Sequence, residues 1–210
     1  MALDKFSKRN AEVLETNVAV ESLSDHQLIE AVKAGDEDAF AEIVNRYRNA
    51  ITNYLFRFLN DYEEAVDLAQ ETFVRVYFAV ERYHTDYAFS TYIYRIATNL
   101  AISELRKRKR RKLISLTGLF QFDNEEEKEF QPPDEKPLPD ANLLEDEQSR
   151  TIARAIEALP EKYRAPIILR DVEEKTYDEI AQILGLGLGT TKSRINRARG
   201  LLREKLKNYF

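Results

Sequence analysis

The chain has 210 residues, of which 43% are hydrophobic and 33% charged, which is typical of a soluble, helix-rich protein. It contains no cysteine, so disulfide bonds and thiolate metal sites are excluded. No apolar run approaches the roughly 20 residues of a membrane span, and the first residues lack the apolar segment of a signal peptide. We therefore expect no membrane insertion.

The net charge of −5 hides an uneven distribution along the chain. Residues 95–112 hold eight Lys or Arg and one acid, and residues 190–207 hold seven and one. Between them, residues 123–147 hold eleven acids and two bases. Because clustered positive charge is typical of nucleic-acid binding, the two basic stretches are candidates for contact with DNA or RNA.

Residues 1–23 show little pattern and are interpreted as an N-terminal arm. Helical periodicity over residues 24–112 predicts a small domain with one short and three longer helices. Ser24 with Gln27 indicates a capping box, and Asp36 indicates the N-cap of a long helix. Apolar residues at three- and four-residue steps form one face of that helix: Phe40, Ile43, Val44, Tyr47, Ile51, Tyr54, Leu55 and Phe58.

The next helix is expected to follow Asp61, which with Glu64 forms a further cap. Its predicted core face holds Ala65, Leu68, Ala69, Thr72, Phe73, Val76 and Val80. The third long helix is expected to begin near Ser90 and Thr91. Its predicted core face holds Ile93, Ile96, Ala97 and Leu100.

Residues 113–143 contain four of the six prolines and the acidic run NEEEKE, so we interpret them as a linker with little regular structure. Helical periodicity resumes over residues 144–210. Its later part predicts a helix with a Thr176–Glu179 capping box, a turn at Gly185, and a last helix capped by Thr190 or Thr191, which together form a helix-turn-helix. The predicted fold is all-α, with two small helical domains joined by a flexible acidic linker.

The last helix separates into two faces when residues are placed about 100° apart. The inner face is predicted to hold Thr191, Ile195, Ala198 and Leu202, and the outer face Lys192, Ser193, Asn196, Arg197 and Gly200. In a helix-turn-helix such outer residues meet base edges in the major groove, while further basic residues hold phosphates. A solvated basic helix that only packs on its neighbour is the alternative, and the capped preceding helix favours DNA.

Two outer stripes of the first domain are unusual. On its second long helix Asp67, Glu71, Val74 and Phe78 lie opposite the core face, which suggests a protein partner or cover by another segment of this chain. On the third, basic and aromatic residues are typical of single-stranded nucleic-acid binding. The alternative is that the tyrosines are core and the basic run is a solvated helix end. These residues are Tyr92, Arg95, Asn99, Arg106 and Arg110, after Tyr83, His84, Tyr87 and Phe89.

At this point the segments resemble a known family. Residues 67–77, DLAQETFVRVY, and 89–110, FSTYIYRIATNLAISELRKRKR, resemble region 2 of the extracytoplasmic-function (ECF) sigma factors of the sigma-70 family. Residues 158–206 resemble region 4 of the same family. The resemblance implies a cytoplasmic initiation factor that binds core RNA polymerase and promoter DNA, duplex and single-stranded, and is often blocked by an anti-sigma factor.

The resemblance also implies roles for particular residues. Binding to the clamp helices of the polymerase β′ subunit would fall to Asp67, Leu68, Gln70, Glu71, Phe73, Val74 and Phe78. Binding to the −10 element, including an unpaired base, would fall to Tyr83, Phe89, Tyr92, Arg95, Asn99, Arg106 and Arg110. Binding to the −35 element would fall to Thr190, Lys192, Ser193, Asn196, Arg197 and Arg199, while region 4 docks on the β-subunit flap. Tyr92 stands where the family usually has Trp.

Two other classes of function compete with this interpretation. A stand-alone helix-turn-helix transcriptional regulator would need neither outer stripe of the first domain. An enzyme is not expected, because the chain has only His26 and His84, no cysteine, no Gly-rich phosphate loop and no carboxylates at metal-ligand spacing. We predict no catalytic residue, metal or cofactor.

Overall fold

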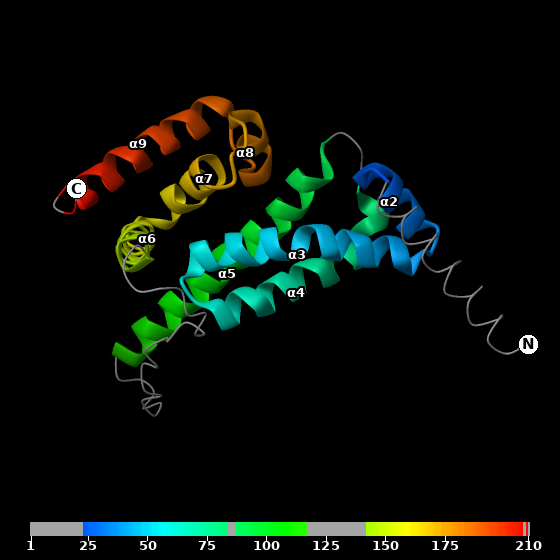
Figure 1. Cartoon of the computed structure of the whole chain (residues 1–210), viewed down its shortest axis with the longest axis horizontal. Coiled ribbons are helices and arrows are strands. Elements are labelled where there is room, and N and C mark those ends of the chain that lie inside the picture. Colours follow the sequence, from blue (N-terminus) through cyan, green and yellow to red (C-terminus); the bar gives the residue numbers. More distant parts are fainter. Residues whose placement is uncertain (1–22, 84–86, 117–141, 208, 210) are drawn as a thin grey trace, which may run out of the picture.

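The computed structural model describes residues 23–83, 87–116, 142–207 and 209 (Figure 1). Within these ranges the regular structure consists of α-helices and one short 3-10 helix, without strands. The predicted all-α fold class is therefore confirmed. The predicted N-terminal arm, apart from Leu23, and most of the predicted linker lie outside the described residues.

The N-terminal domain is a bundle in which α3, α4 and α5 pack against one another and the short α2 packs on α3. Its helices are α2 (Asp25–Lys33), α3 (Glu37–Leu59), α4 (Tyr62–Ala79), the 3-10 helix η1 (Val80–Arg82) and α5 (Phe89–Leu116). Helix α5 begins one residue before the predicted start at Ser90, and it continues four residues past the predicted domain end at 112.

Local sequence signals set the starts of these helices. Both hydrogen bonds of the Ser24–Gln27 capping box are present, and the Asp36 carboxylate accepts from the Ala39 amide at 3.1 Å. The Asp61 carboxylate accepts from the Glu64 amide at 3.1 Å, so the three predicted caps of this domain are confirmed. Such caps satisfy amides that have no partner within the helix, each stabilising it by about 1 kcal/mol.

The core of the N-terminal domain holds the predicted apolar faces. Tyr54 and Phe58 of α3 are fully buried, and the Tyr54 hydroxyl lies 2.7 Å from the Thr98 hydroxyl of α5. The far end of α5 is tied to the α3–α4 corner by Arg108, whose guanidinium bonds to the carboxylates of Asp61, at 2.9 Å, and Glu64. These bonds connect the last turns of α5 to the start of α4.

The C-terminal domain consists of four helices: α6 (Asn142–Glu157), α7 (Glu161–Asp171), α8 (Tyr177–Leu184) and α9 (Leu188–Leu206). The predicted capping box of Thr176 and Glu179 is present, and Gly185 ends α8 in the left-handed conformation at φ 62°. These observations confirm the predicted helix-turn-helix. Ile152 of α6 is 41% exposed.

The start of the last helix differs from the prediction. Helix α9 begins at Leu188, with Gly187 as an N-cap that has no side chain to accept a bond. Thr190 and Thr191 lie inside the first turn, so the prediction that one of them caps the helix is wrong. The buried Thr191 hydroxyl instead donates to the Gly187 carbonyl at 3.2 Å.

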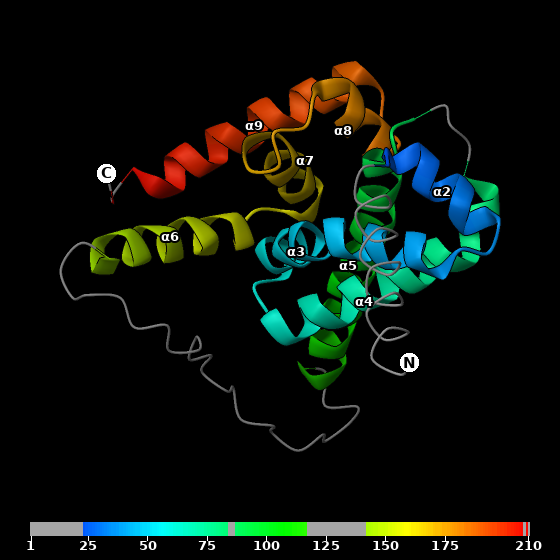
Figure 2. The same cartoon turned by 45° about the vertical axis from the view of Figure 1, so that its right-hand side comes forward.

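The two domains pack against each other. Helix α8 contacts α5, and α6 and α7 contact α3, so buried residues of both domains form one continuous cluster. Turning the molecule by 45° keeps α6 to α9 on one side of the N-terminal bundle (Figure 2). Among the described helices, none combines the length and hydropathy needed to cross a membrane.

Candidate polymerase and nucleic-acid interfaces

Helix α4 presents an exposed apolar and acidic surface, which we call the α4 outer face (Asp67, Gln70, Glu71, Val74 and Phe78). The Phe78 side chain is 81% exposed and Val74 is 52% exposed. No described segment covers them, which removes the alternative of intramolecular cover within this part of the chain. Exposed apolar groups of this kind, rimmed by polar residues, are typical of protein-binding sites.

Not all residues predicted to bind polymerase lie on this face. Leu68 and Phe73 belong to the core, where they are 8% and 6% exposed. They hold α4 against the bundle and do not present their side chains to a partner. Tyr77, which the sequence analysis did not single out, is 44% exposed and packs edge-on against Phe78, with ring centroids 5.7 Å apart. Its spacing, three residues after Val74, is the sequence signal that could have identified it.

A hollow of about 530 Å³ joins the α4 outer face to α5. Sequence reasoning treated the stripes of the two helices separately, whereas the structure brings them onto one continuous surface. Arg75, Arg82 and Ile96 are lining residues that the prediction missed, because their meeting depends on how α4 and α5 pack. The lining consists of Val74, Arg75, Phe78, Ala79, Arg82, Tyr92, Ile96 and Asn99.

The α5 outer stripe (Tyr92, Arg95, Asn99, Arg106 and Arg110) is open to solvent except at Tyr92, which is half-buried. Burial raises the pKa of the Tyr92 hydroxyl. The stripe combines one aromatic ring, one side-chain amide and three guanidinium groups. Such a surface can stack on a base, hydrogen-bond to a base edge and neutralise phosphates.

Tyr83 and Phe89 lie beneath this stripe and are 6% and 3% exposed. The Tyr83 hydroxyl donates to the Tyr87 carbonyl at 2.7 Å, and its ring centroid lies 5.2 Å from that of Tyr92. The alternative interpretation, that the aromatic residues belong to the core, is therefore correct for Tyr83 and Phe89. The rings of Tyr83 and Phe89 pack against the Tyr92 ring from the core side. His84 lies outside the described residues.

Some residues of the basic run at the end of α5 form ion pairs within the domain, and others are exposed. Arg108 holds the α3–α4 corner, and Lys107 and Arg111 bond to the buried carboxylate of Glu104 at 3.1 and 2.9 Å. Burial alone would raise the pKa of Glu104, but the hydrogen bond from Lys107, the interaction with Glu64 and the positive charges of Lys107 and Arg111 together outweigh burial, so the pKa lies below its usual value. Arg106 and Arg110 are exposed and project on the outer stripe.

The α9 outer face (Thr190, Lys192, Ser193, Asn196 and Arg197) is exposed along its whole length. The inner residues Thr191, Ile195 and Ala198 are fully buried, as predicted. Side chains that donate hydrogen bonds, and that differ in length, are therefore exposed on the first turns of α9, the second helix of the helix-turn-helix. Arg and Asn at such positions can each form two hydrogen bonds to a base edge.

A second hollow, of about 470 Å³, opens between the start of α7 and the start of α9. Its lining adds Lys162, Tyr163 and Arg194 to the α9 outer face, and the Lys162 amino group lies 5.0 Å from the centre of the Tyr163 ring. Sequence reasoning missed these residues, because periodicity does not reveal which helix starts meet. A basic hollow beside the exposed face of α9 has the charge that suits a phosphate of a DNA backbone.

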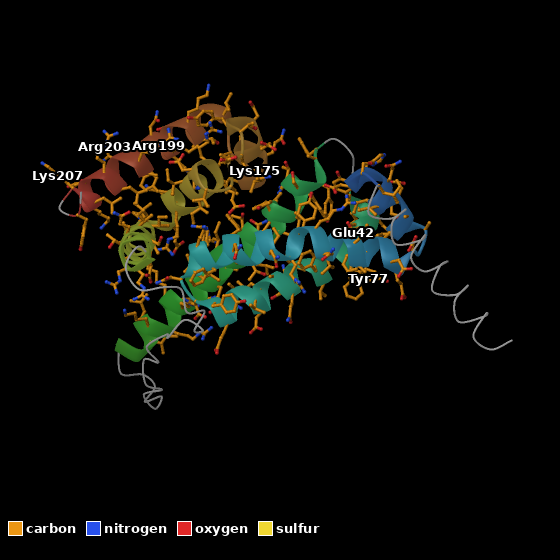
Figure 3. The ribbon with its side chains drawn as sticks, viewed as in Figure 1. Glu42, Tyr77, Lys175, Arg199, Arg203 and Lys207 are labelled. Atoms are coloured by element: carbon orange, nitrogen blue, oxygen red, sulfur yellow. The ribbon has the colours of Figure 1, made fainter. Side chains whose placement is uncertain are left out.

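Arg199 has a different environment from the rest of its helix. Its guanidinium forms two bonds to the carboxylate of Asp171 at the end of α7, with Nε 3.0 Å from Oδ2. The hydrogen bonds that the guanidinium donates to this carboxylate raise the pKa of Arg199. Figure 3 shows Arg199, Arg203 and Lys207 following one another along α9. Arg199 therefore forms an ion pair within its own domain, and the Lys192 amino group lies 5.9 Å from the centre of the Tyr177 ring.

Comparisons with known proteins agree with this geometry. Residues 43–111 match the family Sigma-70 region 2, and residues 149–202 match the family Sigma-70, region 4. The described part of the chain holds no cluster of His, Asp and Glu suited to a metal ion.

Relatives match across nearly the whole chain. The ECF RNA polymerase sigma factor SigW of Bacillus subtilis is 38% identical over 86% of this chain and 95% of its own. The RNA polymerase sigma-H factor of Pseudomonas aeruginosa is 37% identical over 83% and 90%. In fold, the chain is similar to CnrH in complex with the cytosolic domain of CnrY, with a TM-score of 0.64 at 22% identity over 88% and 97%. The chain therefore belongs to the ECF sigma factors of the sigma-70 family.

Proposed function

We propose that the α4 outer face, the α5 outer stripe and the α9 outer face divide the work of this sigma factor, which binds core RNA polymerase and directs promoter-specific initiation. The observation that carries the proposal is the meeting of the exposed Phe78 with Tyr92 and Asn99 around one hollow. That hollow joins the α4 outer face, which would bind protein, to the α5 outer stripe, which would bind single-stranded DNA. A stand-alone helix-turn-helix regulator is not favoured, because it has no use for this combination.

The α4 outer face binds the clamp helices of the polymerase β′ subunit. Burying a large apolar side chain contributes about 1.5–3 kcal/mol, and Phe78 has most of its surface available for such burial. Asp67 and Glu71 at the rim then meet basic groups of the partner. Tyr77 extends the apolar contact, while Leu68 and Phe73 keep the helix in place from the core side.

The α5 outer stripe binds the −10 element. Arg95, Arg106 and Arg110 neutralise phosphates, Asn99 bonds to a base edge, and the Tyr92 ring stacks on an unpaired base at the hollow. Tyr83 and Phe89 act indirectly, by holding the Tyr92 ring from beneath.

The α9 outer face reads the −35 element in the major groove. Lys192, Ser193, Asn196 and Arg197 reach base edges, and Thr190 contacts the backbone beside them. Lys162 and Arg194 add phosphate contacts from the neighbouring hollow. Arg199 positions α9 through Asp171, and the C-terminal domain as a whole docks on the β-subunit flap.

An anti-sigma protein is a further proposed partner. One solved structure of similar fold, with a TM-score of 0.60, holds the sigma factor RpoE in complex with the anti-sigma factor NepR from Bartonella quintana. The factor acts in the cytoplasm, where bacterial RNA polymerase transcribes, and it contributes binding without catalysing a reaction itself.

Run-off transcription on a pool of promoter fragments tests the proposal. Core RNA polymerase with the chain is expected to start at discrete sites that core polymerase alone does not use. Replacement of Arg197 by Ala is expected to redistribute those starts among promoters, whereas replacement of the exposed Arg203 on the same helix serves as the matched control. Unchanged start sites on adding the chain would contradict the proposal.

A further inference from the structure

Four aromatic rings of the N-terminal domain pack in one group, which we call the Tyr92 ring group (Tyr47, Tyr83, Phe89 and Tyr92). Phe89 meets Tyr47 and Tyr83 edge-on, with ring centroids 5.3 and 5.8 Å apart. Tyr92 lies on the outside of the group, with its ring centroid 5.2 Å from that of Tyr83 and 6.3 Å from that of Phe89. The position of the Tyr92 ring therefore depends on the rings packed behind it.

The Tyr92 ring has little other support. One side of it packs against Tyr83 and Phe89, and the other lines the hollow of about 530 Å³ that α4 and α5 share. Its hydroxyl lies 3.5 Å from the Ala79 carbonyl, so this bond is weak. A binding group must be held to within about 0.5 Å of its working position by the residues around it. For Tyr92 that support comes from the core side.

The first anchor of the ring group is Asp25, in the first turn of α2. Its carboxylate accepts from the Tyr47 hydroxyl through one oxygen and from the Arg46 guanidinium, at 3.2 Å, through the other. Burial, followed by the bond to Asp25, raises the pKa of the Tyr47 hydroxyl, so this group stays protonated and is the donor. Arg46 also bonds to Glu42 at 2.7 Å, which holds the arrangement on α3.

The second anchor is Lys33, in the last turn of α2. Its amino group donates to the Tyr83 carbonyl at 3.4 Å and to the Glu30 carboxylate at 2.9 Å. The Tyr83 hydroxyl donates to the Tyr87 carbonyl at 2.7 Å, so Tyr83 is held through both its backbone and its side chain. The two ends of α2 thus bond to two different members of the ring group.

These bonds add direction to the packing of α2. The helix packs on α3 and η1 (Figure 1), and Leu28, Ile29 and Val32 are the residues that it buries. Apolar burial attaches a helix without specifying its exact orientation, whereas a hydrogen bond depends on both distance and angle. The bonds at the two ends of α2 therefore fix how the ring group lies against it.

We infer that Asp25, Lys33 and Tyr47 are positioning residues of the −10 surface, which hold the inner rings so that Tyr92 faces the hollow. The inference rests on the proposed binding of the −10 element by the α5 outer stripe. None of the three residues acts on a base directly, because each works through the rings behind Tyr92. Helix α2 thereby determines how well an unpaired base stacks on a ring that belongs to α5.

A positioning role has a consequence that a purely structural role does not. The α4 and α9 outer faces belong to other helices, so loss of the α2 bonds is expected to reduce promoter opening while polymerase affinity and −35 binding stay unchanged. A loss of domain stability would reduce polymerase affinity as well.

Fluorescence of the free chain tests the placement of the ring. The chain has no tryptophan, so Tyr92→Trp supplies a single indole at the position in question. In this background the double variant Lys33→Met with Tyr47→Phe removes both bonds and keeps the ring of Tyr47. Loss of the bonds is expected to shift the ratio of correctly placed to displaced rings about fivefold toward displaced, which acrylamide quenching and anisotropy detect. Unchanged quenching and anisotropy would overturn the inference.

Promoter opening is measured in the chain that keeps Tyr92, with 2-aminopurine in the −10 element. The double variant is expected to open about fivefold fewer promoters, at unchanged affinity for core polymerase. Lys33→Arg keeps a donor for the Tyr83 carbonyl and is expected to rescue most of the loss seen with Lys33→Met. Glu30→Gln removes the other partner of Lys33 and is expected to open promoters normally. Equal losses in Lys33→Met and Glu30→Gln would count against the bond to Tyr83.

Tyr54→Phe is the matched control for stability. Tyr54, like Tyr47, lies on α3, and its buried hydroxyl bonds to α5. Its ring belongs to a different group, with its centroid 5.2 Å from that of Tyr94. The Tyr94 hydroxyl in turn donates to the Glu173 carboxylate, and the Lys175 amino group lies 4.8 Å from the Tyr94 ring centre. Tyr54→Phe is expected to change neither the indole signal nor promoter opening, and changes equal to those of the double variant would overturn the inference.

The two measurements also separate this inference from the proposed function. The indole is read without DNA, so an undisplaced indole contradicts the positioning role alone. A displaced indole with unchanged promoter opening would instead contradict the proposed stacking of a base on Tyr92, and the inference would fall with it.

Discussion

Arg199 of α9 and Asp171 of α7 form a two-point ion pair that joins α9, the proposed −35-binding helix, to the rest of its domain. Both side chains are partly exposed, at 42% and 37%. Water therefore screens the pair, and its contribution to the free energy of unfolding is at most about 1 kcal/mol. The main effect of the ion pair is to fix the orientation of the Arg199 guanidinium.

Substituting Asp171→Asn releases that guanidinium toward the DNA backbone. One further phosphate contact makes the slope of log affinity against log salt steeper by about 0.9 for duplex carrying the −35 element. Titration of the duplex at several salt concentrations measures the slope. Arg199→Ala serves as the control, and an unchanged slope for Asp171→Asn would show that Arg199 does not reach a phosphate.

Substituting Phe78→Ala is expected to weaken binding to core RNA polymerase by 10- to 100-fold, which corresponds to about 1.4–2.8 kcal/mol at the centre of an interface. Because Phe78 is 81% exposed, the thermal unfolding midpoint should not change. Competition against an unsubstituted, labelled chain measures the affinity. Tyr62→Ala, an exposed aromatic at the other end of α4, is the control and should bind normally.

Substituting Tyr92→Trp is expected to increase the fraction of open promoter complexes several-fold. A base stacked on an aromatic side chain is stabilised by about 1–3 kcal/mol, and the indole offers more area than the phenol. The open hollow beside Tyr92 leaves room for the larger ring. Fluorescence of 2-aminopurine placed in the −10 element reports the opening, and equal opening in both chains would place the unpaired base elsewhere.

Substituting Thr176→Ala removes the capping box of α8 and is expected to lower the free energy of unfolding by about 1 kcal/mol. The same capping box changes the pKa of Glu179. Burial would raise this pKa, but the hydrogen bonds from the Thr176 amide and hydroxyl lower it below its usual value. A carboxylate with a lowered pKa stabilises the fold above its unfolded pKa, and this stabilisation is lost as the pH falls through the folded value.

Urea unfolding at pH 7 and below about pH 4 checks this prediction. The unsubstituted chain should lose stability on acidification more steeply than Thr176→Ala. Ser24→Ala, which removes the equivalent box of α2 built with an uncharged Gln27, is the control and should keep the steeper acid dependence. Parallel acid profiles for all three chains would contradict the role given to Glu179.

Sequence reasoning succeeded where structure is set locally. The caps at Ser24, Asp36, Asp61 and Thr176 depend on side chains within three residues of one another, so their patterns could be recognised directly. The start of α9 could not be recognised in this way, because Gly187 caps it without a side chain.

The candidate surfaces were predicted less completely. Helical periodicity correctly placed Val74 and Phe78 outside and Ile195 inside, since these depend on one helix alone. It did not reveal that Tyr83 and Phe89 are buried or that Lys162 lies beside α9, because those positions depend on packing between elements. The Tyr94–Glu173 bond joins residues 79 positions apart, which no local pattern encodes.

Between Tyr92 and Leu100, each side of helix α5 faces a different neighbour. Ile93 and Leu100 face the bundle, Arg95 and Asn99 face outward, and Tyr94 meets the C-terminal domain. Few substitutions in this segment should therefore be neutral, and tolerated substitutions should lie mainly outside it. Exchanging the segment between related factors to alter promoter choice would also exchange the docking contact, so a working chimaera needs Glu173 and Lys175 chosen together with it.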